Sequence, residues 1–187
     1  MMKTKICAFD FDGTLIKKDS IKLFCKWVCL NKIEFLLIYH LYFRIITIFN
    51  YKKLKIIRAS FFYNLYIKRN LDINLFTKKL INEEFLDSNK LINDLKTKYH
   101  VIIVSASFDF ILEGYSKHYN IPLFSNSINN LIDLNHSNKV EVIKSNYGPD
   151  HVLELAYGNS EGDFEMLRYS KIPYFRFKNG EIIQWQK

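Results

Sequence analysis

Two aspartates separated by one residue, Asp10 and Asp12, follow a short apolar segment near the start of the chain. A carboxylate can attack phosphorus and form an aspartyl-phosphate intermediate. A second carboxyl group two residues further on can protonate the leaving alkoxide and then activate water. The pair therefore predicts phosphoryl transfer, with Asp10 as the nucleophile and Asp12 as the acid and base.

Two later segments supply groups that suit a phosphate. Ser105 follows the apolar run 101–104, and Lys139 opens a later helical segment. Phosphoryl transfer gathers negative charge on the equatorial oxygens, which a hydroxyl donor and an ammonium group stabilise. Gly13 has no side chain, so backbone amides beside it can approach a phosphate closely. These residues are the candidates for binding the transferred group.

A fourth polar segment supplies oxygen ligands for a metal ion. Asn159 and Asp163 follow the apolar run 152–157. Mg²⁺ is usually held by one or two carboxylates together with waters and substrate phosphate. The candidate ligands are therefore Asp10, Asp163 and the side-chain carbonyl of Asn159, and the predicted cofactor is Mg²⁺.

Short apolar runs alternate with helical periodicity, which indicates an α/β fold with a largely parallel sheet. Ligands of such sheets lie beyond the carboxyl ends of the strands, so the polar groups are expected to face one crevice. Ser20 and Asp72 are predicted helix caps. The predicted strands are 5–9, 101–104, 122–124, 152–157, 172–177 and 181–185, and the predicted later helices are 108–119, 139–146 and a segment that ends at residue 168.

Helical periodicity dominates residues 20–99, directly after the first strand, with breaks near Asn31, Asn50, Asn70 and Asp87. The predicted organisation is therefore a core of residues 1–14 and 91–187, with a long helical insertion at residues 15–90 directly after the first strand.

Four motifs, in order, resemble those of the haloacid dehalogenase superfamily. They are Asp10-Phe11-Asp12-Gly13-Thr14-Leu15, Ser105 at a strand end, Lys139, and Gly158-Asn159-Ser160-Glu161-Gly162-Asp163. The helical insertion is similar in position to the cap of the phosphoserine-phosphatase-like subclass. Three segments resemble that subclass most: 10–20, Val104-Ser105-Ala106-Ser107 and 157–167. The resemblance covers about 110 residues of the core.

The resemblance implies a Rossmann-like core, a helical cap and a phosphatase that uses Mg²⁺. It implies that Asp10 is the nucleophile and Asp12 the acid and base. The implied phosphate-binding residues are Gly13, Ser105, Ala106 and Lys139, and the implied metal ligands are Asp10, the Asp12 carbonyl, Asn159 and Asp163. The first acidic position of the last motif is Asn159 here, and its amide oxygen can ligate magnesium but brings no charge.

Several site residues have a second interpretation. Lys144 is the alternative to Lys139 as the phosphate-binding lysine. Asp19 matches a position where relatives carry an acidic residue near a substrate amine, and a helix cap explains it equally well. The remaining candidates for substrate contact are Ser107, Arg44 and Arg58.

The net charge of +8 is concentrated in one part of the chain. Residues 17–70 contain 12 Lys and Arg against two acidic residues. This excess indicates either a solvated basic face or attraction to an anionic partner, such as a membrane surface or a phosphorylated substrate. No motif that reads nucleic acid accompanies the charge, so no nucleic-acid partner is expected.

Composition is typical of a globular chain, with 49% hydrophobic and 25% charged residues. The most apolar window, residues 35–49, is shorter than the roughly 20 residues of a membrane-spanning helix and contains His40 and Arg44, so it is predicted to be buried or interfacial. The three cysteines are predicted to be reduced core thiols, and the expected location is the cytoplasm.

The leading functional hypothesis is a Mg²⁺-dependent phosphatase for a small phosphomonoester, such as a phosphorylated amino alcohol, polyol or sugar. One alternative is a lipid-headgroup phosphatase that docks on an anionic membrane through the basic insertion. Another is a non-catalytic phosphate-binding protein in which Asn159 marks a lost metal site. Turnover that depends on magnesium separates the enzymes from the binding protein.

Overall fold

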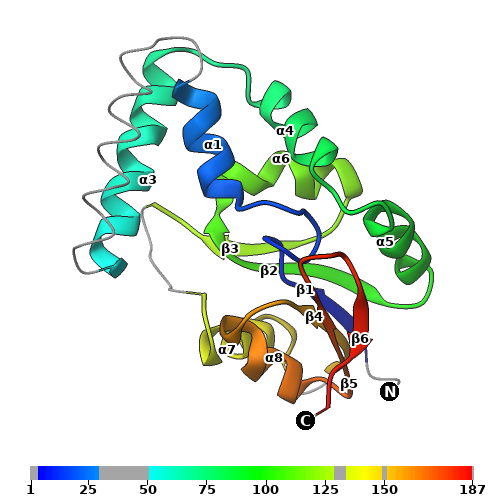
Figure 1. Ribbon diagram of the computed structural model, residues 1–187. Coiled ribbons are helices and arrows are strands. Elements are labelled where there is room, and N and C mark those ends of the chain that lie inside the picture. The colour runs from blue at the N-terminus through cyan, green and yellow to red at the C-terminus, as the bar shows by residue number, and fades with distance from the viewer. Residues whose placement is uncertain (1–3, 30–50, 129–133, 149–150, 187) are drawn as a thin grey trace.

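A computed structural model describes residues 4–29, 51–128, 134–148 and 151–186, with the backbone alone for residues 51–58. The strands within these ranges form one sheet in the order β3-β2-β1-β4-β5-β6 (Figure 1). Neighbouring strands are parallel except for the antiparallel pair β5 and β6. The strands are β1 (Thr4–Phe9), β2 (His100–Phe108), β3 (Leu123–Asn126), β4 (His151–Gly158), β5 (Ile172–Arg176) and β6 (Ile182–Gln184).

Helices cover both faces of the sheet. Alternate residues of a strand point to opposite faces, and here both sets are apolar and need to be covered. Ile6 and Ala8 of β1 belong to a hydrophobic cluster with α7 (Ser137–Tyr147) and α8 (Phe164–Tyr169). Cys7 and Phe9 belong to the cluster on the other face. That cluster includes residues of α5 (Ser88–Lys96) and α6 (Asp109–Tyr119). The core strands are therefore buried on both sides, as expected for parallel strands.

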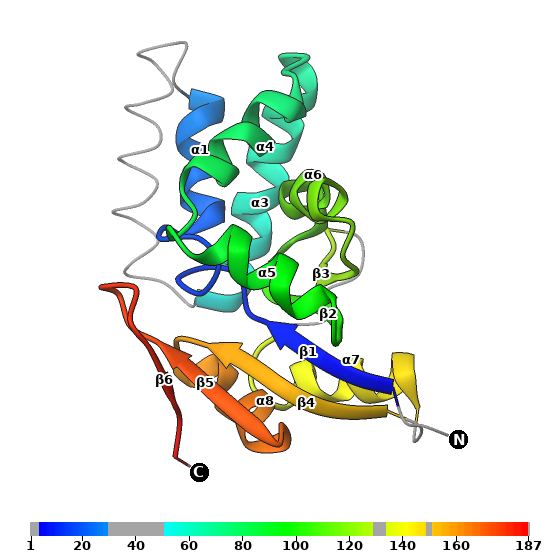
Figure 2. The same cartoon turned by 90° about the vertical axis from the view of Figure 1, so that its right-hand side faces the viewer.

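A group of helices lies beyond the carboxyl ends of the strands (Figure 2). It consists of α1 (Ser20–Cys29), α3 (Tyr51–Lys68) and α4 (Ile73–Asn82). Phe24 of α1, Phe62 of α3 and Phe76 of α4 share one hydrophobic cluster with β1 and β2. The helical group thus lies over the end of the sheet where ligands of α/β proteins bind. The boundary of a cap domain at residues 15 and 90 stays a prediction.

The two chain segments that connect this group to the sheet are fastened to each other. The Lys17 N–H donates to the Glu83 carbonyl at 2.8 Å, and the Phe85 N–H donates to the Leu15 carbonyl at 3.3 Å. The hydroxyl of Ser88 also donates to the Leu15 carbonyl, at 2.8 Å. The passage between sheet and helices is therefore braced by hydrogen bonds that the sequence pattern did not indicate.

The second connecting segment is also tied to the core. The Glu84 carboxylate accepts hydrogen bonds from the hydroxyls of Tyr115 and Tyr119 on α6, at 2.6 and 2.7 Å. Asp87 accepts two from the buried guanidinium of Arg176 on β5, at 2.6 and 2.9 Å. These contacts hold the start of α5 against the sheet.

Most predicted elements are present, and their ends differ by a few residues. Asp72 caps α4, because its carboxylate accepts the Asn74 N–H at 2.9 Å. The prediction that Ser20 caps the first helix is wrong. Asp19 does so instead, since its carboxylate accepts the Lys22 N–H at 2.8 Å. Lys139 is the third residue of α7 rather than its first.

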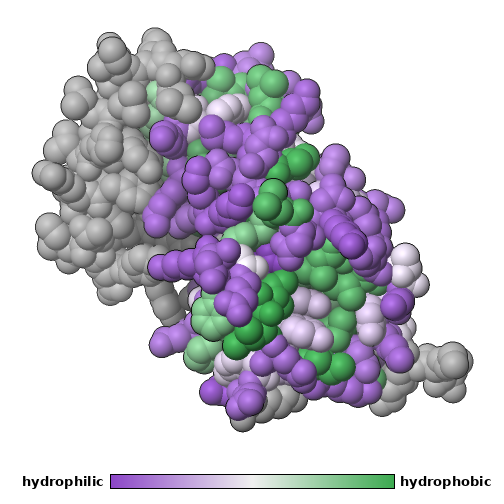
Figure 3. Space-filling model, turned by 45° about the vertical axis from the view of Figure 1, so that its right-hand side comes forward, coloured by the Kyte–Doolittle hydropathy of each residue, from purple (hydrophilic) through white to green (hydrophobic). Residues whose placement is uncertain are grey.

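The predictions about the basic segment 17–70 and the apolar window 35–49 are tested only in part. The breaks near Asn31 and Asn50, the window 35–49 and much of the basic segment lie outside the described residues. No helix of the described ranges has both the length and the hydropathy needed to cross a bilayer. On the face shown in Figure 3, hydrophilic residues cover most of the described helices, and hydrophobic residues show as separate groups. Cys7, Cys25 and Cys29 are buried thiols, as predicted. The cytoplasmic location stays a prediction.

Candidate active site

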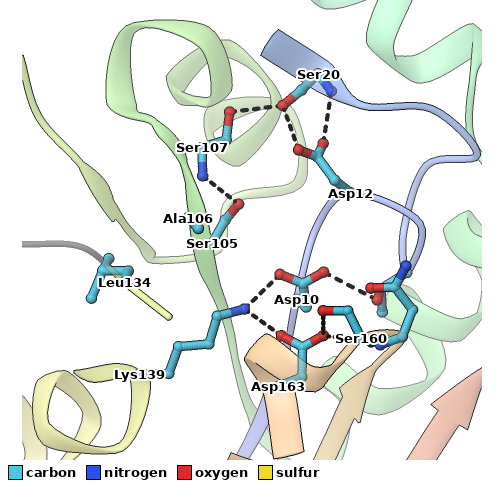
Figure 4. Close-up of polar contacts among 12 residues, drawn as sticks. Asp10, Asp12, Ser20, Ser105, Ala106, Ser107, Leu134, Lys139, Ser160 and Asp163 are labelled. Carbon is cyan, nitrogen blue, oxygen red and sulfur yellow. Dashed lines mark hydrogen bonds and ion pairs between the residues drawn. The ribbon is translucent and has the colours of Figure 1, made fainter. Parts of the chain in front are cut away.

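Asp10 and Lys139 meet at the carboxyl end of β1 (Figure 4). Asp10 follows the last residue of β1, and its N–H donates to the Tyr157 carbonyl of the neighbouring strand β4 at 2.9 Å. One carboxylate oxygen of Asp10 accepts a bond from the Lys139 Nζ at 2.6 Å, and the other accepts a bond from the Thr14 hydroxyl at 3.3 Å. Lys139 is 1% exposed, so its charge is almost completely removed from water.

Asp163 is the second carboxylate on the same ammonium group. Its Oδ1 lies 2.6 Å from the Lys139 Nζ. Its Oδ2 accepts the N–H groups of Asn159 and Ser160, both at 3.0 Å, and the Ser160 hydroxyl at 2.9 Å. These bonds close the loop that follows β4 into a capping box around Asp163. Two carboxylates from two strand ends therefore converge on one cation.

Asp12 lies beside this group and is held by the start of α1. Its Oδ1 accepts the Ser20 N–H at 2.9 Å, and its Oδ2 accepts the Ser20 hydroxyl at 3.1 Å. The Ser20 Oγ also lies 2.7 Å from the Ser107 Oγ. Ser107 belongs to β2, so this contact joins the helical group to the strand end beside the site.

The end of β2 brings Ser105 and Ala106 to the same place. The Ser105 Oγ accepts the Ser107 N–H at 3.1 Å, and accepting this bond leaves the Ser105 hydroxyl hydrogen available. The Ala106 carbonyl accepts a bond from the Asn126 side chain at 2.7 Å. Together these groups enclose a cavity of about 200 Å³, lined by Asp10, Asp12, Asp19, Ile21, Ser105, Ala106, Ser107, Asn135, Lys139, Asn159, Ser160 and Asp163.

Burial and neighbouring negative charge raise the pKa values of both Asp10 and Asp12. Burial and the charge of Asp163 raise the pKa of Asp10 to about 6, although the charge and hydrogen bond of Lys139 partly lower it. Burial, with the charges of Asp19 and Asp10, raises the pKa of Asp12 to about 8 despite the hydrogen bonds from Ser20. A raised pKa favours the protonated form of Asp12, which is the form that a general acid requires.

Lys139 and Asp163 remain charged partners. Burial by itself would lower the pKa of Lys139, but the carboxylates of Asp10 and Asp163 raise it above its usual value. Burial would likewise raise the pKa of Asp163, but Lys139 and the hydrogen bonds from the loop lower it. The pair is an ammonium with an ionised carboxylate.

Of the other residues predicted for the site, some line the cavity and others do not. Asn159 packs on Gly13, where φ is +77° and an added Cβ would lie 2.0 Å from the Asn159 Nδ2. Asp19 both lines the cavity and caps α1, so the structure is compatible with both of its interpretations. The Lys144 ammonium lies 4.7 Å from the centre of the Tyr169 ring, and Lys144 does not line the cavity. Arg44 and the side chain of Arg58 lie outside the described residues.

Sequence reasoning missed residues whose positions depend on tertiary contacts. Ser20 was assigned to helix capping, and its two bonds to Asp12 join residues eight apart through a turn. Asn135 lines the cavity without a motif that would mark it. Thr14 lies inside the recognised motif, yet its bond to Asp10 was not anticipated.

The cavity is lined by oxygen donors of the types that Mg²⁺ prefers. Across the ranges that the structure describes, no group of three or more His, Cys, Asp or Glu side chains could hold a metal ion. The set instead combines two carboxylates that already share one cation with the amide of Asn159. A few carboxylates with neutral oxygens suit Mg²⁺, whereas closed structural zinc sites take four nitrogen or sulfur ligands.

Several solved structures share this fold. A protein of unknown function from Bordetella pertussis Tohama I has a TM-score of 0.72 at 14% identity, covering 91% of this chain and 89% of that chain. A phosphoserine phosphohydrolase-like protein from Francisella tularensis subsp. tularensis SCHU S4 has a TM-score of 0.53 at 19% identity, covering 91% and 86%. A substrate-bound phosphoserine phosphatase has a TM-score of 0.57 at 18% identity, covering 94% and 87%. These likenesses confirm the predicted fold class.

The sequence comparisons complete this picture. A comparison with curated proteins gives no significant match. The family model described as haloacid dehalogenase-like hydrolase matches residues 7–168, which include all four motifs. The predicted superfamily and the predicted hydrolase class are thereby confirmed. This chain belongs to the haloacid dehalogenase-like hydrolase family.

Proposed function

We propose that this protein hydrolyses a small phosphomonoester with the help of Mg²⁺, through a phosphoryl group carried by Asp10. The observation that carries the proposal is the meeting of Asp10 and Asp163 on Lys139, at 2.6 Å each, beside a cavity that Asp12 and Ser105 also line. A buried ammonium flanked by two carboxylates is costly to build without a function, because desolvation opposes each charge.

The proposed reaction has two steps. In the first, a carboxylate oxygen of Asp10 forms a bond to phosphorus, and the bond from phosphorus to the ester oxygen breaks. The departing oxygen keeps that electron pair and takes the proton of Asp12. In the second, water forms a bond to phosphorus while Asp12 takes its proton. The bond from phosphorus to Asp10 then breaks, so inorganic phosphate and the free carboxylate are released.

Other groups stabilise charge during both steps. In the proposal, Lys139 and the Ser105 hydroxyl face the equatorial oxygens, and the backbone around Gly13 and Ala106 approaches them. Asp10, the Asp12 carbonyl, Asn159 and Asp163 would hold magnesium. When bound, the ion neutralises negative charge on the phosphoryl group and orients it.

The size of the cavity favours a small substrate. A cavity of about 200 Å³ is smaller than the roughly 300–1,000 Å³ of pockets that enclose drug-sized ligands. The likeness to phosphoserine phosphatases supports the choice of a phosphomonoester. In this proposal α1, α3 and α4 form a cap over the substrate, and Asp19 lies where it can meet a positive group on it.

The proposal is tested with the purified protein and a panel of small phosphomonoesters, with and without Mg²⁺. We expect turnover that needs the metal and is lost in Asp10→Asn, because an amide does not attack phosphorus. Asp94→Asn, an exposed position on α5, is the matched control and is expected to keep full activity. Substantial turnover by pure Asp10→Asn protein would rule out the mechanism.

A further inference from the structure

Ser20 makes a two-point contact with the proposed acid and base. Its N–H and its hydroxyl donate to different oxygens of the Asp12 carboxylate, at 2.9 and 3.1 Å (Figure 4). A single hydrogen bond would leave the carboxyl group free to rotate about its last bond. Two bonds to two oxygens fix the plane of the group as well as its position.

Ser20 is itself held from the other side. Its Oγ lies 2.7 Å from the Ser107 Oγ, and the Ser107 N–H donates to the Ser105 Oγ. A serine hydroxyl has one hydrogen to donate, so when Ser20 donates to Asp12, the Ser107 hydroxyl donates to Ser20. The three serines are between 0% and 2% exposed, so water does not compete for these bonds.

Helix formation does not account for this arrangement. Asp19 supplies the side-chain cap of α1 by accepting the Lys22 N–H. The Ser20 hydroxyl is therefore not needed to begin the helix. Its contacts join the first residue of α1 to the acidic motif after β1 and to the end of β2.

The contact also determines which part of Asp12 remains available. A carboxyl group has about four lone-pair sites, and the two bonds from Ser20 occupy one on each oxygen. Asp12 lines the cavity, so a proton on a remaining site can face the substrate. Loss of the Ser20 hydroxyl removes one bond and allows the carboxyl group to turn away from the leaving oxygen.

We propose that Ser20 is a positioning residue that holds the Asp12 carboxyl group toward the ester oxygen, and that Ser107 holds Ser20 in place. The inference rests on the proposed function, because it assigns a support to the acid of that reaction. It predicts an effect on one chemical step rather than on activity in general. That step is the protonation of the departing oxygen, which matters most when the leaving group is a strong base.

The test compares an alkyl and an aryl phosphomonoester, glycerol 2-phosphate and p-nitrophenyl phosphate. Departure of an alkoxide needs a proton, whereas p-nitrophenolate leaves readily without one. The constant kcat/KM covers the steps up to departure of the leaving group, so the later hydrolysis of the phosphoenzyme does not enter the comparison.

In Ser20→Ala we expect kcat/KM for the alkyl ester to fall by about 10- to 100-fold, and for the aryl ester by less than about threefold. Ser107→Ala should shift the ratio in the same direction by a smaller factor. Ser20→Thr keeps the hydroxyl and should restore the wild-type ratio. Ser170→Ala is the control for loss of a buried hydroxyl, since Ser170 is 0% exposed and its Oγ donates to the backbone carbonyl of Leu167.

An unchanged ratio in Ser20→Ala, or an equal change in Ser170→Ala, would overturn the inference. Crystal structures of the wild type and Ser20→Ala provide a second readout that does not require activity. An Asp12 carboxyl group that keeps its orientation in the variant would contradict the positioning role, and a rotated group would support it. If the wild type hydrolyses neither these esters nor any other member of the phosphomonoester panel, the proposed function fails, and the crystal structures alone decide the role of Ser20.

Discussion

Replacing Lys139 by methionine removes the one charge that Asp10 and Asp163 share, while keeping a side chain of similar length. The Nζ lies 2.6 Å from an oxygen of each carboxylate, and Lys139 is 1% exposed. The substitution leaves two buried carboxylates close to each other without their cation. We expect a large loss of stability together with a loss of activity.

The magnitude follows from these distances. At an effective dielectric constant of about 20, two unit charges 2.6 Å apart attract by about 6 kcal/mol, and desolvation of the charges offsets much of this. Removal of one partner of a buried pair typically costs about 3–5 kcal/mol, which we expect here for the free energy of unfolding of Lys139→Met. Adding Asp163→Asn removes the repulsion, so the double variant should lose less than the sum of the single changes.

The loss should also depend on pH. Lys139 lowers the pKa of both carboxyl groups, so without it their folded-state pKa values rise. A raised folded-state pKa contributes stability that is present at low pH and is lost as the pH rises through that value. With Lys139 present the pKa of Asp163 lies below its usual value and that of Asp10 is about 6, so the deficit of the variant should begin to widen below about pH 4 and widen further above about pH 6.

Urea unfolding in EDTA, followed by circular dichroism at several pH values, measures both effects. Lys90→Met, at an exposed position on α5, is the control for loss of a lysine charge and should change the free energy of unfolding by less than about 0.5 kcal/mol. A loss below about 1 kcal/mol, or a deficit that does not change with pH, would refute the reasoning that the ammonium neutralises two buried carboxylates.

Three further predictions concern the surroundings of the site. Asn159→Asp should tighten apparent Mg²⁺ affinity by about tenfold, because it adds a charge to the proposed ligand set. Titration of activity against Mg²⁺ measures this, and an unchanged affinity would place Asn159 outside the metal sphere. Gly13→Ala should destabilise the protein by about 1–2 kcal/mol in thermal or urea unfolding, because φ is +77° there and the new Cβ displaces the Asn159 amide. A neutral change would show that the turn tolerates a side chain. Asp87→Ala should cost about 2–3 kcal/mol by urea unfolding, because it leaves the buried Arg176 guanidinium without its carboxylate. Equal stability of Asp87→Ala and the exposed control Asp94→Ala would contradict this.

The sheet and the strand-end positions of the site were predictable because they depend on local pattern. A β-branched run such as 101–104 indicates a strand that is buried on both faces. The polar residues directly after such a strand lie at the edge of the sheet where ligands bind. Asp10 and Ser105 could therefore be assigned to one crevice from the sequence alone. The contact of Lys139 with Asp163 was not predicted, because the sequence assigned these residues separate roles in binding phosphate and metal.

The contacts that support the site were not predictable in this way. Ser20 has the sequence signature of a helix cap, and only the turn after Asp12 brings it onto the carboxylate. Arginine side chains usually lie at the surface, and nothing in the sequence around Arg176 indicates otherwise. Arg176 is nevertheless 1% exposed, and its guanidinium is paired with Asp87, 89 residues earlier in the chain. Such pairs depend on long-range packing, which neither periodicity nor spacing encodes.

The central claim is that Asp10 carries the phosphoryl group during turnover. The most direct measurement is a rapid acid quench of the wild-type enzyme with Mg²⁺ and a ³²P-labelled phosphomonoester, followed by mapping of the labelled peptide. The account predicts label on the peptide that contains Asp10, released by hydroxylamine as an acyl phosphate is, and absent from Asp10→Asn. Rapid turnover with no labelled peptide, or label on a different residue, would contradict it.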